Sequence, residues 1–298
     1  AEPEAAPRSS TSTSTSTIER PTVSASAPGP EPEPDAVLPS APPPTSASPS
    51  VSDVAMWSVV SIVDGDTLEV SGAEGDMTVR LIGVNAPEDG ECLADEAAAA
   101  LRELAAGPVV LLSDETDIDQ YGRALRYVET PEGLDVGGEL VRRGLAISRR
   151  YEPDTGRNDL YDALQADAVA AGVGTWAPDA CGPAADQVSI EVDVRHDAAG
   201  DDNENLNDEW VRFTNTGGSA VDLDGWTVAD ESASHRYTFG GLALAPAASV
   251  TLFTGCGTDS KTERYWCNTG SAVWNNAGDT VFLRDPNGNN VVVHPYDG

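Results

Sequence analysis

The chain has 298 residues, enough for two modest domains, and carries 50 acidic against 17 basic side chains, a net charge of −33. This charge excludes binding of nucleic acid through the overall field of the protein, so any phosphate recognition must come from a local site. No apolar run reaches the roughly 18 residues that a membrane-spanning helix needs, so we expect no membrane span.

The negative charge is spread along the chain. Residues 57–182 contain 9 basic and 25 acidic side chains, residues 183–298 contain 6 and 18, and only one basic side chain, Lys261, is a lysine. Such a surface is typical of salt adaptation, and we expect a halophilic protein. The alternative is that the acidic groups recruit cations for a function.

Four cysteines are present, none of them in a C-x-x-C pair or beside a histidine at zinc-finger spacing. We therefore expect two disulfides formed in an oxidising compartment rather than a metal site. Among the three possible pairings we favour Cys92–Cys181 and Cys256–Cys267, because each stays within one predicted domain. The cysteines and the small first residue, Ala1, suggest a removed signal peptide and a secreted or extracellular protein, with attachment to the cell surface open.

Residues 1–55 consist mostly of Ser, Thr, Pro, Ala and Glu. Such a segment cannot bury enough apolar surface to offset its ordering entropy, so it predicts a disordered N-terminal stalk. Whether the stalk is glycosylated, anchors the protein or is a plain linker stays open.

Residues 56–182 predict a compact domain of strands and helices. Strand patterns cover 57–70, 77–84, 109–112 and 123–130. Helical spacing covers 93–106, 136–146 and 158–172, with Asn158 as a predicted N-cap and Gly172 as the stop of the last helix.

Residues 187–298 instead show short alternating strands separated by Gly, Asn, Asp and Pro, which predicts an all-β sandwich. The predicted strands are 189–194, 209–215, 221–230, 235–239, 249–255, 272–275, 280–285 and 291–296.

Three polar segments of the first domain stand where ordinary strands would end. They are Asp-Gly-Asp-Thr at 64–67, Arg-Leu-Ile-Gly-Val-Asn-Ala-Pro-Glu at 80–88 and Asp-Gln-Tyr-Gly-Arg at 119–123. Each segment alone also fits a turn or a strand-ending loop. In this order and spacing, together with LVRRGLA at 140–146 and Gly-x-Gly-x-Trp at 172–176, they resemble the staphylococcal nuclease (thermonuclease) family.

The resemblance implies an OB-like five-stranded β-barrel with three helices and hydrolysis of DNA and RNA with little sequence preference, usually with calcium. Arg80 and Arg123 match the two catalytic arginines of the family, whose forked donors fit phosphate oxygens. Glu88 matches the carboxylate that acts as base or orients the water. Tyr121 matches a tyrosine near the nucleotide phosphate, and Tyr151 matches one that stacks on the base; core packing is the alternative for both.

The resemblance also implies a metal site at Asp66, Asn85 and the carbonyl of Ala86. Asn85 replaces a carboxylate of the family, so the site has one negative charge fewer. We expect weaker calcium binding or use of another divalent cation, and Asp64 is a candidate to compensate.

Four arginines, Arg142, Arg143, Arg149 and Arg150, cluster in sequence near the predicted nucleotide cleft. They predict either a local basic strip for the substrate or surface partners for the many carboxylates; the sequence leaves both open.

The second domain resembles the lamin tail domain, through Glu209-Trp210-Val211, the segment VDLDGWTVAD at 221–230 and AVWNNAGDTVFLRDPNG at 272–288. This resemblance implies an immunoglobulin-like sandwich and no particular ligand. We expect Trp210, Trp226 and Trp274 to lie in its core.

The whole chain therefore predicts a multidomain, monomeric protein: a stalk, a nuclease-like domain and a lamin tail-like domain. The predicted function is a secreted, calcium-dependent, sequence-nonspecific endonuclease. The alternative is a catalytically weakened nucleic-acid-binding or cell-envelope-attached module. The sequence does not choose between DNA and RNA, nor does it identify a partner of the second domain.

Overall fold

The computed structural model describes residues 55–185, 188–232 and 234–298. The predicted N-terminal stalk, apart from its last residue, lies outside this part of the chain. Within it, no helix is long and apolar enough to cross a membrane. Disulfides join Cys92 to Cys181 and Cys256 to Cys267, the pairing that the sequence favours.

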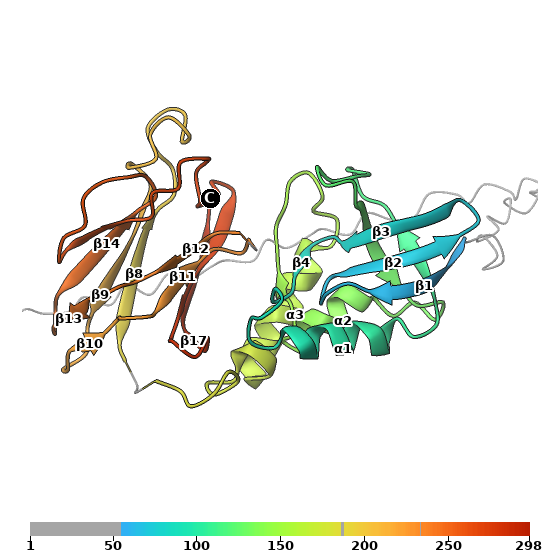
Figure 1. Cartoon of the computed structure of the whole chain (residues 1–298), viewed down its shortest axis with the longest axis horizontal. Helices are drawn as coiled ribbons and strands as arrows, with labels where there is room; N and C mark the ends of the chain where they lie inside the picture. The colour runs from blue at the N-terminus through green and yellow to red at the C-terminus, as the bar shows by residue number, and fades with distance from the viewer. Residues whose placement is uncertain (1–54, 186–187, 233) are drawn as a thin grey trace, which may run out of the picture. The chain divides into compact units, whose positions relative to one another are not determined.

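The first half of the described chain forms a closed β-barrel with strand order β1-β2-β3-β6-β5, flanked by three helices (Figure 1). Its elements are β1 (Met56–Ile62), β2 (Thr67–Gly72), β3 (Gly75–Leu81), β4 (Val84–Asn85), α1 (Ala94–Leu104), β5 (Pro108–Leu112), β6 (Ala124–Glu129), α2 (Val136–Arg142), β7 (Ile147–Ser148), α3 (Asn158–Ala171) and the 3₁₀-helix η2 (Gly174–Trp176). This confirms the predicted five-stranded barrel with three helices.

The barrel closes over a core to which both strands and helices contribute. Leu68 of β2 and Val79 of β3 are fully buried beside Leu101 of α1 and Leu140 of α2. Alternate strand residues face inward, as a barrel requires, and the apolar faces of the helices cover the remaining side. The short pair β4–β7 lies outside the barrel sheet and joins Val84–Asn85 to Ile147–Ser148.

The start of α3 differs from the prediction. Asn158 is the first helical residue rather than the N-cap, and its side chain makes no capping hydrogen bond. It is 3% exposed, and neither its Oδ1 nor its Nδ2 has a partner within the described residues. The prediction was wrong because tertiary burial, rather than local capping, determines where this side chain lies. Gly172 does end the helix, in the left-handed conformation with φ 60°.

The second half is an immunoglobulin-like sandwich of two four-stranded sheets, β12-β11-β16-β17 and β15-β14-β9-β8, with a two-stranded pair β10-β13. Its strands are β8 (Ile190–Arg195), β9 (Trp210–Asn215), β10 (Val221–Asp222), β11 (Thr227–Ala229), β12 (Arg236–Thr238), β13 (Ala243–Leu244), β14 (Ser249–Phe253), β15 (Glu263–Tyr265), β16 (Gly278–Arg284) and β17 (Asn290–Asp297). This confirms the predicted sandwich.

Its core forms between the two sheets. Phe213 of β9 and Leu252 of β14 pack with Val228 of β11 and Val281 of β16. Trp226 and Trp274 belong to this core, as predicted. Trp210 does not: it is only partly buried, and the guanidinium of Arg212 lies 4.6 Å from the centre of its ring.

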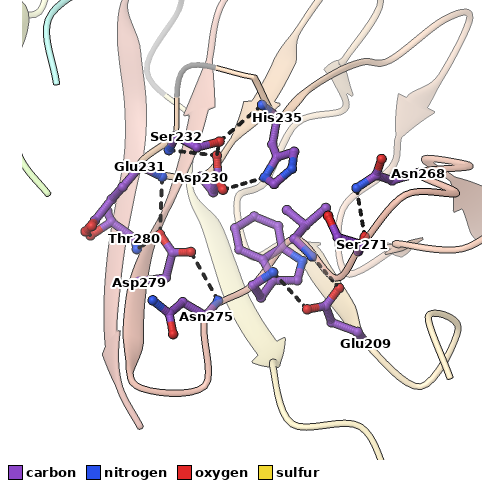
Figure 2. Close-up of polar contacts among 12 residues, drawn as sticks. Glu209, Asp230, Glu231, Ser232, His235, Asn268, Ser271, Asn275, Asp279 and Thr280 are labelled. Atoms are coloured by element: carbon purple, nitrogen blue, oxygen red, sulfur yellow. Dashed lines mark hydrogen bonds and ion pairs between the residues drawn. The ribbon is translucent and has the colours of Figure 1, made fainter. Parts of the chain in front are cut away.

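The predicted strand at 272–275 is absent, because a buried carboxylate takes its backbone donors. Glu209 is fully buried, and its oxygens accept hydrogen bonds from the backbone N–H groups of Val273 (3.0 Å) and Trp274 (2.8 Å) (Figure 2). A segment bonded to a side chain in this way needs no partner strand. Glu209 therefore anchors the loop that inserts Trp274 into the core.

Candidate active site

Strand register brings the three polar segments of the barrel to one end of the sheet. Thr67, the first residue of β2, pairs with Arg80 near the end of β3, so Asp66 lies beside Arg80. The next neighbour, β6, runs parallel to β3, with Ala124 opposite Val79. Arg123, immediately before β6, therefore lies at the same end as Arg80. Residues 57 positions apart along the chain thus meet in one place.

Asp66 and Arg80 form a buried ion pair at the centre of this end. Oδ2 of Asp66 lies 2.9 Å from Nη2 of Arg80, and the two residues are 4% and 8% exposed. Burial raises the pKa of Asp66, and the charge of Arg80 opposes this; burial lowers the pKa of Arg80, and the charge of Asp66 opposes this. Each charge therefore offsets the desolvation of the other.

The two terminal nitrogens of Arg80 are committed to the protein itself. Nη1 donates to the carbonyl oxygens of Leu81 (2.6 Å) and Val84 (2.9 Å), while Nη2 donates to Oδ1 of Asn85 (3.1 Å) in addition to its ion pair with Asp66. A guanidinium has five N–H donors. Four of them are therefore used within this cluster, and only Nε–H remains for a ligand.

The three predicted metal-binding residues lie in this same cluster. Oδ2 of Asp66 accepts a hydrogen bond from the backbone N–H of Ala86 (2.8 Å), and Asn85 is bound to Arg80. Asn85 and Ala86 are 6% and 3% exposed. Their hydrogen bonds tie the end of β4 to the loop before β2.

Glu88 lies in the exposed loop that follows β4, where its backbone N–H donates to Oε2 of Glu91 (3.0 Å). Desolvation and the negative charges of Asp66 and Asp64 raise the pKa of Glu88. Its carboxylate is therefore close enough to Asp66 and Asp64 to respond to their charges, and it is open to solvent.

This donor set fits a hard divalent cation in its chemistry. Carboxylate, amide and backbone carbonyl oxygens are the ligands that calcium prefers. Asp64 and Asp66 also raise the pKa of neighbouring carboxyl groups, a repulsion that a bound cation would relieve. In the described residues, no three His, Cys, Asp or Glu side chains are arranged to hold a metal by themselves. A cation would therefore depend on amide and carbonyl oxygens as well.

Arg123 is held by a residue that the sequence analysis did not single out. Oδ2 of Asp119 accepts from Nε of Arg123 (2.7 Å), and Oδ1 accepts from the backbone N–H groups of Tyr121 and Arg123 (both 2.9 Å). Desolvation raises the pKa of Asp119, but these hydrogen bonds outweigh it and the net shift is downward. Both terminal nitrogens of Arg123 remain without a partner in the described chain. The signal was present: the motif itself places an Asp four residues before the Arg.

Two exposed tyrosines of this domain each lie beside an arginine. Tyr121 is 75% exposed and Tyr151 is 56% exposed, so core packing does not explain either of them. The guanidinium of Arg123 lies 5.4 Å from the centre of the Tyr121 ring, and that of Arg149 lies 5.4 Å from the centre of the Tyr151 ring. Each tyrosine therefore offers an open aromatic surface beside a positive charge.

Comparisons with known proteins find a match for each half of the described chain. Residues 78–178 match the family described as Staphylococcal nuclease homologue, and residues 183–298 match the Lamin Tail Domain. An uncharacterized endonuclease of Escherichia coli O157:H7 is 33% identical over 97 residues, 32% of this chain and 63% of that protein, so the chain spans less than two thirds of it. Protein ParB of Escherichia coli is 31% identical over 138 residues, covering 44% of this chain and 76% of the relative. Thermonuclease of Staphylococcus hyicus is 29% identical over 119 residues, covering 37% and 68%.

Proposed function

We propose that this chain, which belongs to the staphylococcal nuclease family and carries a lamin tail domain after its nuclease domain, hydrolyses phosphodiester bonds of DNA and RNA. The observation that carries the proposal is the convergence of Arg80, Arg123 and Glu88 at one end of the barrel. Relatives named as endonuclease, micrococcal nuclease and thermonuclease support it.

Arg123 is the phosphate-binding residue in this proposal. Hydrolysis builds negative charge on the oxygens of the phosphate, and a guanidinium stabilises that charge through paired donors. Asp119 binds Nε of Arg123, and the two terminal nitrogens have no partner among the described residues, so their donors are left for the phosphate. Arg80 adds a fixed positive charge, and its Nε–H is the donor left for substrate.

Glu88 is the proposed general base. It removes a proton from the attacking water while the bond between that oxygen and phosphorus forms and the bond to the leaving oxygen breaks. The exposed position of Glu88, near the buried Asp66–Arg80 pair, gives it access to both water and the phosphate held by the arginines.

Asp66, Asn85 and the carbonyl of Ala86 would hold a divalent cation, with calcium as our first proposal. When bound, such an ion supplies a positive charge that polarises the phosphate. Asn85 contributes an uncharged oxygen, so we propose weaker calcium binding than a second carboxylate would give. Asp64, whose carboxylate accepts from the backbone N–H of Asp66 (3.0 Å), lies close enough to add negative charge.

The wider setting is part of the same proposal. We propose a secreted or extracellular, monomeric and salt-adapted enzyme, with domain limits at 56–182 and 187–298 after a stalk of residues 1–55. Two disulfides and the net charge of −33 support this setting.

Two observations favour a second candidate, a catalytically weakened nucleic-acid-binding or envelope-attached module. Asn85 lacks the charge of a carboxylate, and the terminal nitrogens of Arg80 are used within the protein. Such a module would bind single-stranded DNA without cleaving it.

Cleavage assays with purified protein separate the two candidates. Single-stranded DNA, duplex DNA and RNA are incubated with calcium or with chelator, at low and at multimolar potassium chloride. We expect calcium-dependent cleavage that the Glu88→Gln substitution abolishes. The control, Glu132→Gln, should leave cleavage intact, because it removes the same charge from an exposed turn away from the site residues. Absence of cleavage by folded wild-type protein with every cation tested would refute the nuclease and leave the binding module.

A further inference from the structure

The four arginines clustered at residues 142–150 do not form a common basic strip, because three of them are paired with carboxylates. The pairs are Arg142–Glu139 (2.6 Å), Arg143–Glu139 (2.9 Å), Arg143–Glu103 (3.4 Å) and Arg150–Asp162 (3.2 Å). Arg149 is different. Its guanidinium has no hydrogen bond or ion pair with any side chain in the described part of the protein, although residues 57–182 hold 25 acidic groups.

Arg149 also has a fixed position beside the site. It directly follows β7, which pairs with β4, and its backbone N–H donates to the carbonyl of Gly83 (2.9 Å). Nη1 of Arg80 donates to the carbonyl of Val84, the residue that follows Gly83. The two arginines are thus attached to one short segment, 83–85.

Both arginines carry a full positive charge, and both are attached to the same short segment of the chain. Arg149 therefore adds to the positive potential of the site. Arg102, the other arginine of the barrel half without an ion pair among the described residues, is exposed in the last turn of α1.

Gly83 makes this arrangement possible. Its φ is 77°, in the left-handed region, and a Cβ there would lie 2.8 Å from the ring of Tyr161. A glycine at this position lets the chain turn from β3 into β4 over Tyr161 and still present its carbonyl to Arg149.

We propose that Arg149 binds a second phosphate of the substrate, adjacent to the one that Arg123 and Arg80 hold, while the base between them stacks on Tyr151. The guanidinium over the exposed Tyr151 ring offers a charge and a flat surface side by side, the combination that suits a single-stranded backbone and its bases. This inference rests on the proposed nuclease function and deepens it: the preferred substrate is a single-stranded polynucleotide with consecutive phosphates, rather than an isolated phosphodiester.

Two substrates test the proposal. One is a ten-residue oligothymidylate, and the other is thymidine 5′-(4-nitrophenyl phosphate), which contains a single phosphodiester. We expect Arg149→Gln to raise KM for the oligonucleotide about tenfold, as for the loss of one charge-assisted contact, with kcat changed less than about twofold. KM for the single phosphodiester should stay the same. Arg149→Lys should fall between Arg149→Gln and wild type, because it keeps the charge but loses the fork.

Arg150→Gln and Arg102→Gln are the matched controls, because each removes one positive charge without removing Arg149. If either control raises KM for the oligonucleotide as much as Arg149→Gln does, the proposal is overturned, because the effect is then one of overall charge rather than of a contact at Arg149. An equal effect of Arg149→Gln on both substrates would also overturn it, because Arg149 would then act on the scissile phosphate.

A binding measurement keeps this inference separate from the proposed activity. Fluorescence anisotropy of the labelled oligonucleotide, in chelator and at several salt concentrations, needs no cleavage. We expect Arg149→Gln to reduce the slope of log K against log salt by about 0.7, the value for one phosphate contact on a single strand, and Arg150→Gln to leave it unchanged. If wild type cleaves neither substrate, the nuclease proposal fails, while an unchanged slope in Arg149→Gln refutes the second phosphate site on its own.

Discussion

Replacing Asp279 by Asn should reverse its effect on stability between acidic and alkaline pH. Asp279 is 8% exposed in β16, and its Oδ1 accepts from the backbone N–H groups of Thr280 (2.7 Å) and Glu231 (3.2 Å), while Oδ2 accepts from that of Asn275 (3.2 Å) (Figure 2). Burial, followed by the charges of Glu231 and Asp230, raises the pKa of Asp279 to about 8. The folded sandwich therefore favours the protonated acid.

The sign of the pH dependence follows from this raised pKa. Between the ordinary value of 3.8 and about 8, the folded protein holds a proton on Asp279 that the unfolded chain has lost. The free energy of unfolding therefore falls as pH rises through this range, by up to about 1.4 kcal/mol per pH unit. Over the roughly four pH units between these values the fall amounts to about 6 kcal/mol. Because Glu231, whose pKa is raised to about 7, is coupled to Asp279 and loses its proton in the same range, we assign about half of this, about 2–3 kcal/mol, to Asp279 alone.

Asn cannot ionise, and its Oδ1 can still accept from Thr280 and Glu231. It loses the bond from Asn275, at a cost of about 1 kcal/mol. We expect Asp279→Asn to be less stable than wild type by about 1 kcal/mol at pH 4 and more stable by about 1–2 kcal/mol at pH 9. Urea denaturation followed by tryptophan fluorescence measures both values.

The exposed Asp193 of β8 provides the control, because Asp193→Asn removes the same charge from the surface of the sandwich. Its effect should be small at both pH values. A stability difference between Asp279→Asn and wild type that does not change between pH 4 and pH 9 would refute the reasoning, because the buried carboxyl would then carry no pH-dependent cost.

Two further predictions concern the nuclease domain and the disulfides. Asp119→Asn should lower kcat/KM for DNA about tenfold, because the amide nitrogen cannot accept a hydrogen bond from Nε of Arg123. The control substitution Asp117→Asn should change kcat/KM less than about twofold. Equal losses in the two variants would show that Asp119 does not position Arg123. Double Cys→Ser replacement at Cys92–Cys181 should cost about 5 kcal/mol of unfolding free energy, against about 3 kcal/mol at Cys256–Cys267, because the sequence separations are 89 and 11 residues. Thermal unfolding of the two variants ranks them, and the reverse order would contradict the chain-entropy account.

The barrel and the sandwich were predictable because their signals are local or repeated along the chain. Alternation of apolar residues marks the strands, and Gly, Asn, Asp and Pro residues mark the turns between them. The family resemblance predicted that Asp66, Arg80 and Arg123 lie together at one end of the barrel, which no single segment could establish. Each of the three segments alone also fits an ordinary turn or a strand-ending loop.

Other features depend on partners that the fold supplies from far along the chain. The segment 272–275 alternates like a strand, but Glu209, more than 60 residues earlier, takes its backbone donors. Asn is a residue type that favours the N-cap position, but Asn158 is buried as the first residue of α3. In both cases a long-range contact overrides a local preference, and only the folded chain reveals that contact.

Whether an arginine is free to bind a phosphate also depends on contacts with residues far along the chain. Arg142, Arg143 and Arg150 look identical to Arg149 in the sequence, and what separates them is which carboxylates the helices place nearby. Arg80 matches its motif, yet its terminal nitrogens are used within the cluster that it organises. A motif thus identifies which residues meet, and the hydrogen-bond partners decide which of them can still bind a phosphate.

This distinction explains how so acidic a chain could bind the polyanionic substrate that we propose for it. Residues 57–182 hold 25 acidic against 9 basic groups, so their field repels a nucleic acid at distances beyond a few ångströms. Salt screens that repulsion over about 8 Å at physiological ionic strength and over about 3 Å at molar concentrations, whereas a guanidinium in contact with a phosphate is screened much less. Added salt therefore removes the long-range barrier before it removes the phosphate contacts that we propose for Arg123 and Arg149. For a nuclease of this charge, we expect the proposed activity to persist at salt concentrations that would release a substrate held mainly by a basic surface.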